Sequence, residues 1–299
     1  MDFKISSPGK LLITSEYYVT KGALALAIPT KFRQSLEFKC DNSNKLKWKS
    51  LDENNELWIN CEFELSSFEI KKNKNKFSKT LQSILISANK INPMFLKNNC
   101  GGSVSTHLNF SKKWGLGTSS TLINNISKWA NIDPYELLWS NYKGSGYDIA
   151  CALAKTPILY KLEDSIPIAK SVQFNPDYTK NIFFVYLNKK QDSNKEIDKF
   201  FEMKISDLKK KRLSDLTLEF VNSKTLLDFQ NCIKKHENII SETLKTIPVK
   251  NKYFNDYKGE IKSLGAWGGD FILAAGPINS KKYFYGKGYK TVFNFKEIF

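Results

Sequence analysis

A glycine-rich turn that runs directly into a helical stretch is the feature that most constrains this chain. The turn reads Lys-Lys-Trp-Gly-Leu-Gly-Thr-Ser-Ser over residues 112–120, and the helical stretch covers 122–130. Glycines let the backbone approach an anion closely, and the first N–H groups of a helix point at it with the positive end of the helix dipole. The turn is not a Walker P-loop, because no G-x-x-x-x-G-K-[ST] string occurs. Taken alone, such a turn is more often an ordinary tight connection.

Two further segments change that balance. Ser-Pro-Gly-Lys-Leu-Leu-Ile-Thr-Ser-Glu-Tyr-Tyr-Val covers residues 7–19, and Ser-Leu-Gly-Ala-Trp-Gly-Gly-Asp-Phe covers residues 263–271. In this order, and together with the turn at 112–120, they resemble the three motifs of the GHMP kinases. The wording is most similar to phosphomevalonate kinases, with mevalonate kinases next. Gly-Ser-Gly-Tyr-Asp-Ile-Ala at 144–150 also resembles a set of bacterial GHMP proteins known by the string GYDIA.

The resemblance implies a fold and an activity. The expected fold is α+β, the GHMP kinase fold, with a ribosomal-S5-domain-2-like N-terminal domain and a ferredoxin-like C-terminal domain. Composition changes near residues 163–178, so we predict an N-terminal domain over 1–165, which carries the phosphate-binding loop, and a C-terminal domain over 166–299. The implied activity is an ATP-dependent, Mg²⁺-dependent kinase of a small anionic metabolite. The expected acceptor is 5-phosphomevalonate in the mevalonate (isoprenoid) pathway, and mevalonate is the alternative.

The same resemblance assigns roles to residues. Asp148 resembles the catalytic aspartate near the phosphoryl acceptor, and Lys10 resembles the lysine beside it. Each also has a purely structural alternative: Asp148 could cap a helix, and Lys10 could be a solvated lysine in a turn. Glu16 matches the motif-one glutamate, for which a structural role is at least as well supported. Ser119 is the expected Mg²⁺ ligand. The expected phosphate-binding residues are Gly115, Leu116, Gly117, Thr118, Ser119 and Ser120, and the expected substrate contacts are Lys10, Ser145, Gly268 and Gly269.

Several departures from the family pattern keep a second class of function open. Only 29 positions separate Ser119 from Asp148, fewer than mevalonate-type kinases lead us to expect. Glu136 is a weak candidate for the metal-binding glutamate of that family. Trp267 and Asp270 stand where the family commonly has small residues, Thr118 replaces the usual serine, and motif two lacks its Pro-x-Gly lead-in. The alternative is a non-catalytic protein of the same fold that binds a ligand or a polyanion.

The charge of the chain does not by itself indicate a nucleic-acid partner. The formal net charge is +16, but Arg33 and Arg212 are the only arginines, and lysine is often accompanied by asparagine. Arginine is the preferred fork for phosphate and base contacts, so its scarcity argues against specific nucleic-acid recognition. We expect lysine runs such as 209–211 to be solvated faces. The predicted partner is a small metabolite, without specific nucleic acid or membrane, and a homodimer is left open.

Cysteine, histidine and hydropathy limit the remaining classes. The five cysteines are scattered and lack C-x-x-C spacing, which favours reduced thiols packed as small hydrophobes, and two histidines are too few for a His-rich metal site. No run of about 18 apolar residues occurs, so no membrane span is expected. The N-terminus lacks the layout of a signal peptide. These features predict a cytoplasmic protein.

Hydrophobic periodicity predicts a β-rich first third and alternating strands and helices later. Asp133 followed by Pro134 predicts the start of a short helix. The predicted strands of the first third and just beyond it cover 3–6, 11–14, 23–28, 32–40, 45–49, 57–61, 63–70 and 101–110. The predicted helices cover 77–91, 122–130, 135–141, 194–208, 215–221 and 226–246, and the predicted late strands cover 156–162, 182–187 and 291–295.

Overall fold

The computed structural model describes residues 2–41, 43–96, 101–189, 200, 202–265, 267 and 269–299. The chain forms two compact units, each built from separate stretches of sequence. The first unit comprises residues 1–9, 32–112 and 117–153, and the second comprises 10–31, 113–116 and 154–299. These units follow spatial contacts, so the division of the sequence at 165/166 stays a prediction.

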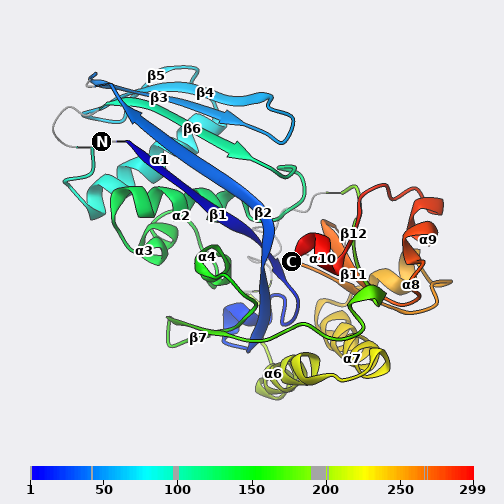
Figure 1. Ribbon diagram of the computed structural model, residues 1–299. Coiled ribbons are helices and arrows are strands. Elements are labelled where there is room, and N and C mark those ends of the chain that lie inside the picture. Colours follow the sequence, from blue (N-terminus) through cyan, green and yellow to red (C-terminus); the bar gives the residue numbers. More distant parts are fainter. Residues whose placement is uncertain are drawn as a thin grey trace. The chain divides into compact units, whose positions relative to one another are not determined.

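The two units contain the following elements (Figure 1). The described strands are β1 (Phe3–Leu12), β2 (Ala25–Cys40), β3 (Lys45–Leu51), β4 (Leu57–Glu64), β5 (Ile70–Lys72), β6 (Gly102–Leu108), β7 (Ile158–Glu163), β8 (Ile166–Ser171), β9 (Ile182–Tyr186), β10 (Glu260–Ser263), β11 (Phe271–Ala275) and β12 (Val292–Asn294). The described α-helices are α1 (Lys76–Ile91), α2 (Thr118–Ala130), α3 (Pro134–Trp139), α4 (Tyr147–Leu153), α6 (Asp207–Asn222), α7 (Leu226–Leu244), α8 (Val249–Tyr253), α9 (Ser280–Gly286) and α10 (Phe295–Ile298). Short 3-10 helices cover Tyr18–Lys21 and Thr179–Asn181.

The first unit is a mixed sheet covered by helices. Its strands run in the order β5-β4-β3-β6-β2, with β1 also paired to β2. β3 and β6 pair in parallel, whereas β2 with β6, β3 with β4 and β4 with β5 pair antiparallel. α1 packs against β4, β5 and α2, and α2 packs against α3 and α4, so the helices form one layer beside the sheet (Figure 1).

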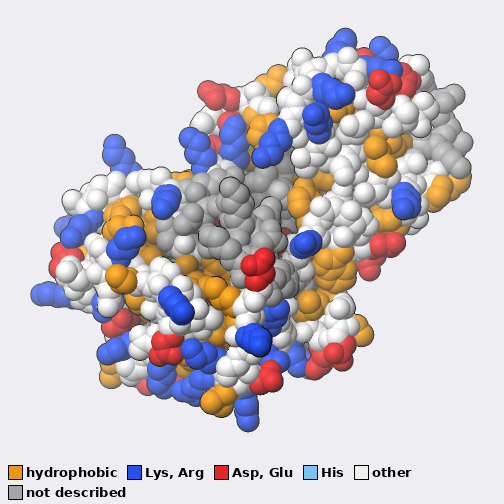
Figure 2. All heavy atoms as spheres, turned by 180° about the vertical axis from the view of Figure 1, so that it is seen from behind, with side chains coloured by type: hydrophobic (Ala, Val, Ile, Leu, Met, Phe, Trp, Pro, Cys, Tyr) orange, Lys and Arg blue, Asp and Glu red, His pale blue; other side chains and the backbone are white. Residues whose placement is uncertain are grey.

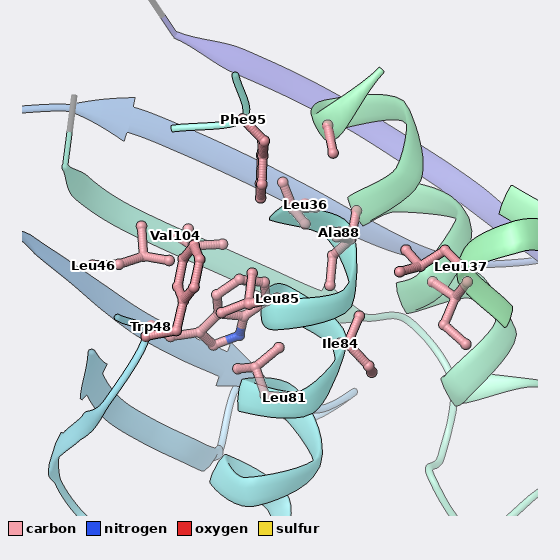
Figure 3. Packing of buried hydrophobic residues seen from close by; sticks show 14 of the residues in the cluster. Leu36, Leu46, Trp48, Leu81, Ile84, Leu85, Ala88, Phe95, Val104 and Leu137 are labelled. Atoms are coloured by element: carbon pink, nitrogen blue, oxygen red, sulfur yellow. The ribbon is translucent and has the colours of Figure 1, made fainter. Parts of the chain in front are cut away.

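A hydrophobic core fills the space between this sheet and its helices. Figure 3 shows Leu81, Leu85 and Ala88 of α1 directed toward Trp48 of β3 and Val104 of β6. The helical spacing of the α1 residues follows from the 3.6-residue period, which brings them onto one face. Removing such side chains from water stabilises the fold by about 1.5–3 kcal/mol each. This core anchors α2, the helix that follows the glycine-rich turn.

β1 and β2 are longer than the sequence predicts. The predicted strands 3–6 and 11–14 merge into one continuous strand, β1, which ends at residue 12, and the predicted strands 23–28 and 32–40 merge into β2, which begins at residue 25. Each strand contains a proline, Pro8 or Pro29, at which the prediction placed a break. Proline removes one ladder donor, but its φ suits extended backbone, and pairing on either side keeps the strand continuous. β1 therefore carries the Pro-Gly-Lys motif on a strand rather than on a turn. The strand predicted over 63–70 is wrong at residues 65–69, which form the turn between β4 and β5.

The second unit contains an antiparallel sheet with a helical pair packed on it. The strand order is β10-β11-β9-β12. β11 and β9 are buried along their whole length. α7 packs against β10 and β11, and α6 lies beside α7 (Figure 1). In the same unit, residues 25–27 of β2 pair with β7, and β7 pairs with β8, a strand that the sequence analysis did not predict. The α+β fold class is confirmed.

Helix starts follow the capping chemistry of their sequences. Asp133 caps α3 by accepting from Tyr135 N, with Pro134 at the first helical position, as predicted. Asn75 and Thr225 form capping boxes at the starts of α1 and α7. The helix predicted over 215–221 is longer, because α6 begins at residue 207. Of the helix predicted over 194–208, residues 194–199 and 201 lie outside the described residues. Residues 202–206 are not helical, so the prediction is wrong there, and the helix resumes only at residue 207 with α6.

The cysteine prediction is wrong at one position. Cys61, Cys151 and Cys232 are free and buried, as expected, but Cys40 is disulfide-bonded. Cys40 closes β2, where its Cα faces that of Gly102 across the ladder. Scattered cysteine positions in a sequence do not reveal which strand ends are neighbours, so the bond was not foreseen.

The surface is rich in basic side chains that are mixed with acidic ones. Figure 2 shows Lys and Arg side chains spread over the face that it draws, with Asp and Glu side chains between them. Some basic and acidic side chains form solvent-exposed ion pairs, such as Lys209 with Glu242 at 3.0 Å. Ion pairs of this kind contribute little to stability. None of the described helices has the length and apolar character that crossing a membrane requires.

Candidate functional site

The glycine-rich turn ends at a helix start without a side-chain cap. Gly115 and Gly117 have φ angles of +67° and +92°, in the left-handed region that glycine tolerates best. α2 begins at Thr118, and its N-cap residue is Gly117, which makes no side-chain hydrogen bond. The first N–H groups of a helix lack intrahelical acceptors. This helix start can therefore offer its N–H groups to an anion.

The three hydroxyl side chains in the first turn of α2 have different surroundings. Ser119 is exposed and Thr118 is half-buried. Ser120 is buried, and its hydroxyl donates to the carbonyl of Gly117 at 2.9 Å. None of these three hydroxyls caps the helix, because the N-cap position is Gly117. Ser119 has the hydroxyl that can reach a ligand or a metal ion from solvent.

The first motif contacts the turn through its backbone. The N–H of Lys10, on β1, donates to the carbonyl of Leu116 at 2.9 Å, and Leu116 is fully buried. The turn is held further by Tyr186, whose hydroxyl donates to the carbonyl of Lys113 at 3.2 Å. Trp114 packs edge-on against Phe271 and Phe293. The backbone of Lys10 and the turn are thus in contact within the second unit.

The third motif also reaches the turn. A Cβ built on Gly115 would lie 2.5 Å from Oδ2 of Asp270 and 2.6 Å from its Cγ, so the carboxyl group fills the space beside that glycine. Asp270 is buried and has a φ of +51°. The sequence had marked Asp270 only as an unusual residue in motif three; its contact with the turn was missed. The N–H of Trp267 donates to the hydroxyl of Tyr17 at 3.0 Å, which links motif three to motif one.

Of the two substrate contacts predicted in motif three, Gly268 and Gly269, the structure describes only Gly269. Gly269 is buried within the described part of the motif. Gly268 lies outside the described residues.

Asp148 and Ser145 belong to the first unit. Asp148 is the second residue of α4, so it lies inside the helix and not at the N-cap position, and its Oδ1 accepts from the N–H of Ile149 at 3.1 Å. Ser145 is buried just before the helix. Burial, followed by the negative charge of Asp148, raises the pKa of the Tyr135 phenol.

Asp148 shares its unit with the start of α2. α4 packs against α2, and Asn124 Nδ2 donates to the carbonyl of Ala152 at 3.2 Å. Lys10, by contrast, belongs to the second unit. That Lys10 and Asp148 face one acceptor atom therefore stays a prediction.

Buried charges next to motif one were also missed. Glu16 is enclosed with His236 and Glu237 of α7 and Lys262 of β10. Desolvation raises the pKa of Glu16 to about 7 and that of Glu237 to about 8, although the positive charge of Lys262 opposes both shifts. Burial, with a further contribution from Lys262, holds the pKa of His236 well below its ordinary value. A signal was present in the sequence at Glu16 alone, as the motif-one glutamate.

The residues present are compatible with Mg²⁺ brought by a nucleotide. Among the described residues no group of three or more His, Cys, Asp or Glu side chains could hold a metal ion. Glu136, the weak candidate for a metal ligand, is exposed in the first turn of α3. Mg²⁺ commonly keeps several waters and binds through one or two protein oxygens plus substrate phosphates. The exposed hydroxyl of Ser119 at an anion-binding helix start fits that arrangement.

Solved structures of kinases share this fold. The mevalonate kinase of Methanococcus jannaschii matches with a TM-score of 0.70 and 15% identity over 98% of each chain. The phosphomevalonate kinase of Streptococcus pneumoniae, in complex with phosphomevalonate and AMPPNP, matches with a TM-score of 0.72 and 14% identity over 98% of this chain and 99% of that one. The galactokinase of Lactococcus lactis, complexed with galactose, matches with a TM-score of 0.70 and 14% identity over 98% and 92%.

The fold is that of the GHMP kinases. No protein-family model matches the chain, and no curated protein matches it significantly in sequence. The GHMP kinase fold is thus established by structure, over nearly the full length of each compared chain, at a sequence identity that leaves the substrate undetermined.

Proposed function

We propose that the chain is an ATP-dependent phosphotransferase that acts on a small anionic metabolite, with 5-phosphomevalonate as the acceptor. One observation carries this proposal. The backbone of Lys10 is hydrogen-bonded to Leu116, within a glycine-rich turn that leads into a helix whose N-cap has no side chain. This bond supports the proposal because, within one unit, it joins the lysine of the Pro-Gly-Lys motif to the glycine-rich turn.

Phosphoryl transfer asks the protein mainly to position two substrates and to stabilise charge. In the proposal, N–H groups at the start of α2 hold the phosphates of ATP. The ammonium of Lys10 offsets negative charge on the acceptor and the transferred group. Asp148 orients the acceptor and accepts its proton where it carries one. A phosphate acceptor is already ionised, so Lys10 contributes more than proton removal does.

Mg²⁺ would be held by the Ser119 hydroxyl together with the nucleotide phosphates, and it would neutralise phosphate charge. Asp270 bears on the same point. Its carboxylate stands beside Gly115 and would repel a bare triphosphate on the turn. Nucleotide binding is therefore expected to require a divalent cation.

The choice of acceptor rests on the residues of the motifs and on one solved structure with the same fold. The Streptococcus pneumoniae enzyme of this fold was solved with phosphomevalonate and AMPPNP. Neighbours with this fold also include mevalonate kinase and galactokinase, so mevalonate and galactose are the natural competitors. A phosphorylated acceptor suits the basic surroundings of motif two, where Lys112 and Lys113 precede the glycines.

Coupled ADP-release assays with 5-phosphomevalonate, mevalonate and galactose at equal concentrations test the proposal. The expected result is Mg²⁺-dependent ADP formation that is fastest with 5-phosphomevalonate. Faster turnover with mevalonate would replace the acceptor and keep the reaction class. In parallel, ATP with Mg²⁺ at 100 times its Kd should stabilise the fold by about 2.7 kcal/mol. Stabilisation by nucleotide without ADP from any acceptor would instead support a non-catalytic binding protein.

A further inference from the structure

Four ionisable side chains meet in the interior of the second unit. They are Glu16, in the segment after β1, His236 and Glu237 on α7, and Lys262 on β10, and none is more than 4% exposed. The ammonium of Lys262 bonds the carboxylate of Glu16 and lies 3.6 Å from Oε1 of Glu237. His236 Nε2 is 3.4 Å from Oε2 of Glu16, and its Nδ1 is 3.9 Å from Oε1 of Glu237. We name these four residues the buried charge cluster.

The buried charge cluster binds the backbone of two sequence motifs. In motif one, the N–H of Ser15 donates to His236 Nε2 at 2.8 Å. In motif three, the N–H of Ser263 donates to Glu237 Oε2 at 3.2 Å, and Lys262 Nζ donates to the carbonyl of Ser263 at 2.9 Å. Since Nε2 accepts a hydrogen bond, the imidazole is neutral and carries its proton on Nδ1. The cluster thus contains the ion pair of Lys262 with Glu16. It also contains His236 and Glu237, each of which accepts a hydrogen bond from a backbone N–H.

The motif-one segment that the cluster holds has an unfavourable backbone conformation. Ser15 and Tyr17, on either side of Glu16, have φ angles of +61° and +63°. Residues with a Cβ rarely adopt this region, and they keep it only where surrounding contacts impose it. Here the contacts are the bond to His236, the bond of Ser15 Oγ to the carbonyl of Leu24 at 2.6 Å, and the bond from Trp267 N to the Tyr17 hydroxyl at 3.0 Å.

We propose that His236, Glu237 and Lys262 are positioning residues that hold motif one and motif three in fixed register, through Ser15 and Ser263, for nucleotide binding. The argument concerns one unit only. Lys10 precedes the held segment on β1, and Asp270 follows Ser263 in motif three; both contact the turn at 115–116. If the cluster releases Ser15 or Ser263, these contacts lose their common support. This inference rests on the proposed nucleotide-binding function, whereas the register itself is measurable without it.

A pair of variants at His236 tests the motif-one contact. His236→Phe removes the acceptor, whereas His236→Gln keeps an oxygen that can replace Nε2. Ile233→Ala is the control, since Ile233 is a fully buried residue of the same helix and its truncation lowers stability without touching the cluster's hydrogen bonds. All are compared well below their unfolding temperatures. The readouts are native-state hydrogen exchange at the Ser15 amide and the Kd for ATP with Mg²⁺.

We expect His236→Phe to speed exchange at Ser15 about tenfold or more and to weaken ATP binding by a similar factor, because a buried donor is left unpaired. His236→Gln should restore both values to near wild type, and Ile233→Ala should change neither. If His236→Phe and Ile233→Ala have the same effect on both readouts, the cluster is only structural and the proposal is overturned.

A second pair of variants guards against a His236→Phe protein that does not fold. Glu237→Met removes the acceptor for Ser263 N–H, and Glu237→Gln keeps one. Because burial raises the pKa of Glu237 to about 8, its carboxyl group is largely neutral at pH 7, and its replacement leaves little unbalanced charge. Faster exchange at Ser263 in Glu237→Met than in Glu237→Gln, with weaker ATP binding, supports the proposal, and equal values contradict it. A wild-type protein that binds no ATP would refute the proposed function, while the exchange rates would still test the register.

Discussion

The N–H of Lys10 donates a hydrogen bond to the carbonyl of Leu116 at 2.9 Å, although 106 positions separate the two residues in the chain. This contact joins a Pro-Gly-Lys strand to a Gly-Leu-Gly turn. Asp270 approaches the same turn at Gly115. Three distant segments thereby converge within one compact unit, and this convergence supports the interpretation of the turn as a phosphate site.

Asp148→Asn should slow ATP-dependent turnover. A general base contributes about 10²- to 10⁴-fold, and the lower part of that range applies if the acceptor is a phosphate that is already ionised. ADP release under saturating substrates measures the effect. Asp177→Asn, at an exposed position away from the motifs, is the control for loss of one carboxylate. Full turnover by the Asp148→Asn protein would remove Asp148 from the catalytic assignment.

Gly115→Ala should weaken nucleotide binding and lower stability. The new Cβ would meet the Asp270 carboxyl group at 2.5 Å, at a φ of +67°. Gly288→Ala is a matched control, since Gly288 has a φ of +89° with no atom within 4 Å of the added Cβ. Left-handed backbone alone costs about 1–2 kcal/mol. Thermal unfolding and ATP titration should show a larger stability loss for Gly115→Ala and a binding defect in that variant only.

The clash with Asp270 can be tested separately. In a Gly115→Ala/Asp270→Gly double variant the carboxyl group is gone, so part of the lost stability should return. Removal of Asp270 should also let ATP bind with less dependence on Mg²⁺, because the repulsive charge is absent. A double variant no more stable than Gly115→Ala would mean that the backbone, not the contact, sets the cost.

The buried charge cluster should make stability fall as pH rises. The pKa of Glu237 is raised from 4.5 to about 8 in the folded state, so the folded protein binds this proton more tightly than the unfolded chain does. By linkage, the free energy of unfolding decreases between about pH 4.5 and about pH 8 as a charge is forced on Glu237, which faces Lys262, Glu16 and His236. Glu16, whose pKa is raised to about 7, acts in the same direction.

Urea unfolding at pH 5, 6, 7 and 8 measures this effect. Glu237→Gln removes the titration, so its advantage in unfolding free energy over the wild type should grow with pH. Glu242→Gln, on the exposed face of the same helix, removes an equal charge and should show no such trend. An advantage of Glu237→Gln that stays constant across this range would contradict the raised pKa.

Leu85→Ala should destabilise the first unit strongly. Leu85 is fully buried among the residues drawn in Figure 3, and truncation of a buried leucine costs about 2–5 kcal/mol. Its neighbour Ile86 is 45% exposed, and Ile86→Ala should cost far less. Denaturant unfolding followed by circular dichroism compares the two. Equal losses would mean that α1 does not pack as described.

The sequence predicted those helix starts and helices whose signals lie in adjacent or regularly spaced residues. Asp133 with Pro134 marked the start of α3, and the apolar period of residues 77–91 marked α1. Pro8 and Pro29 misled the strand assignment, because pairing with neighbours maintains strands that a proline alone would end. The disulfide at Cys40 was likewise missed.

By itself, the sequence determined the glycine-rich turn before α2, the three motifs and the α+β class, since these depend on residues adjacent along the chain. Only the tertiary structure decided that Asp270 lies against Gly115 and that Lys262 is enclosed with Glu16. Burial and charge proximity depend on residues far apart in sequence. Burial raises the pKa of Glu16 to about 7, although the positive charge of Lys262 opposes that shift. A sequence motif identifies a side chain, but the folded structure determines which groups surround that side chain and whether it is charged.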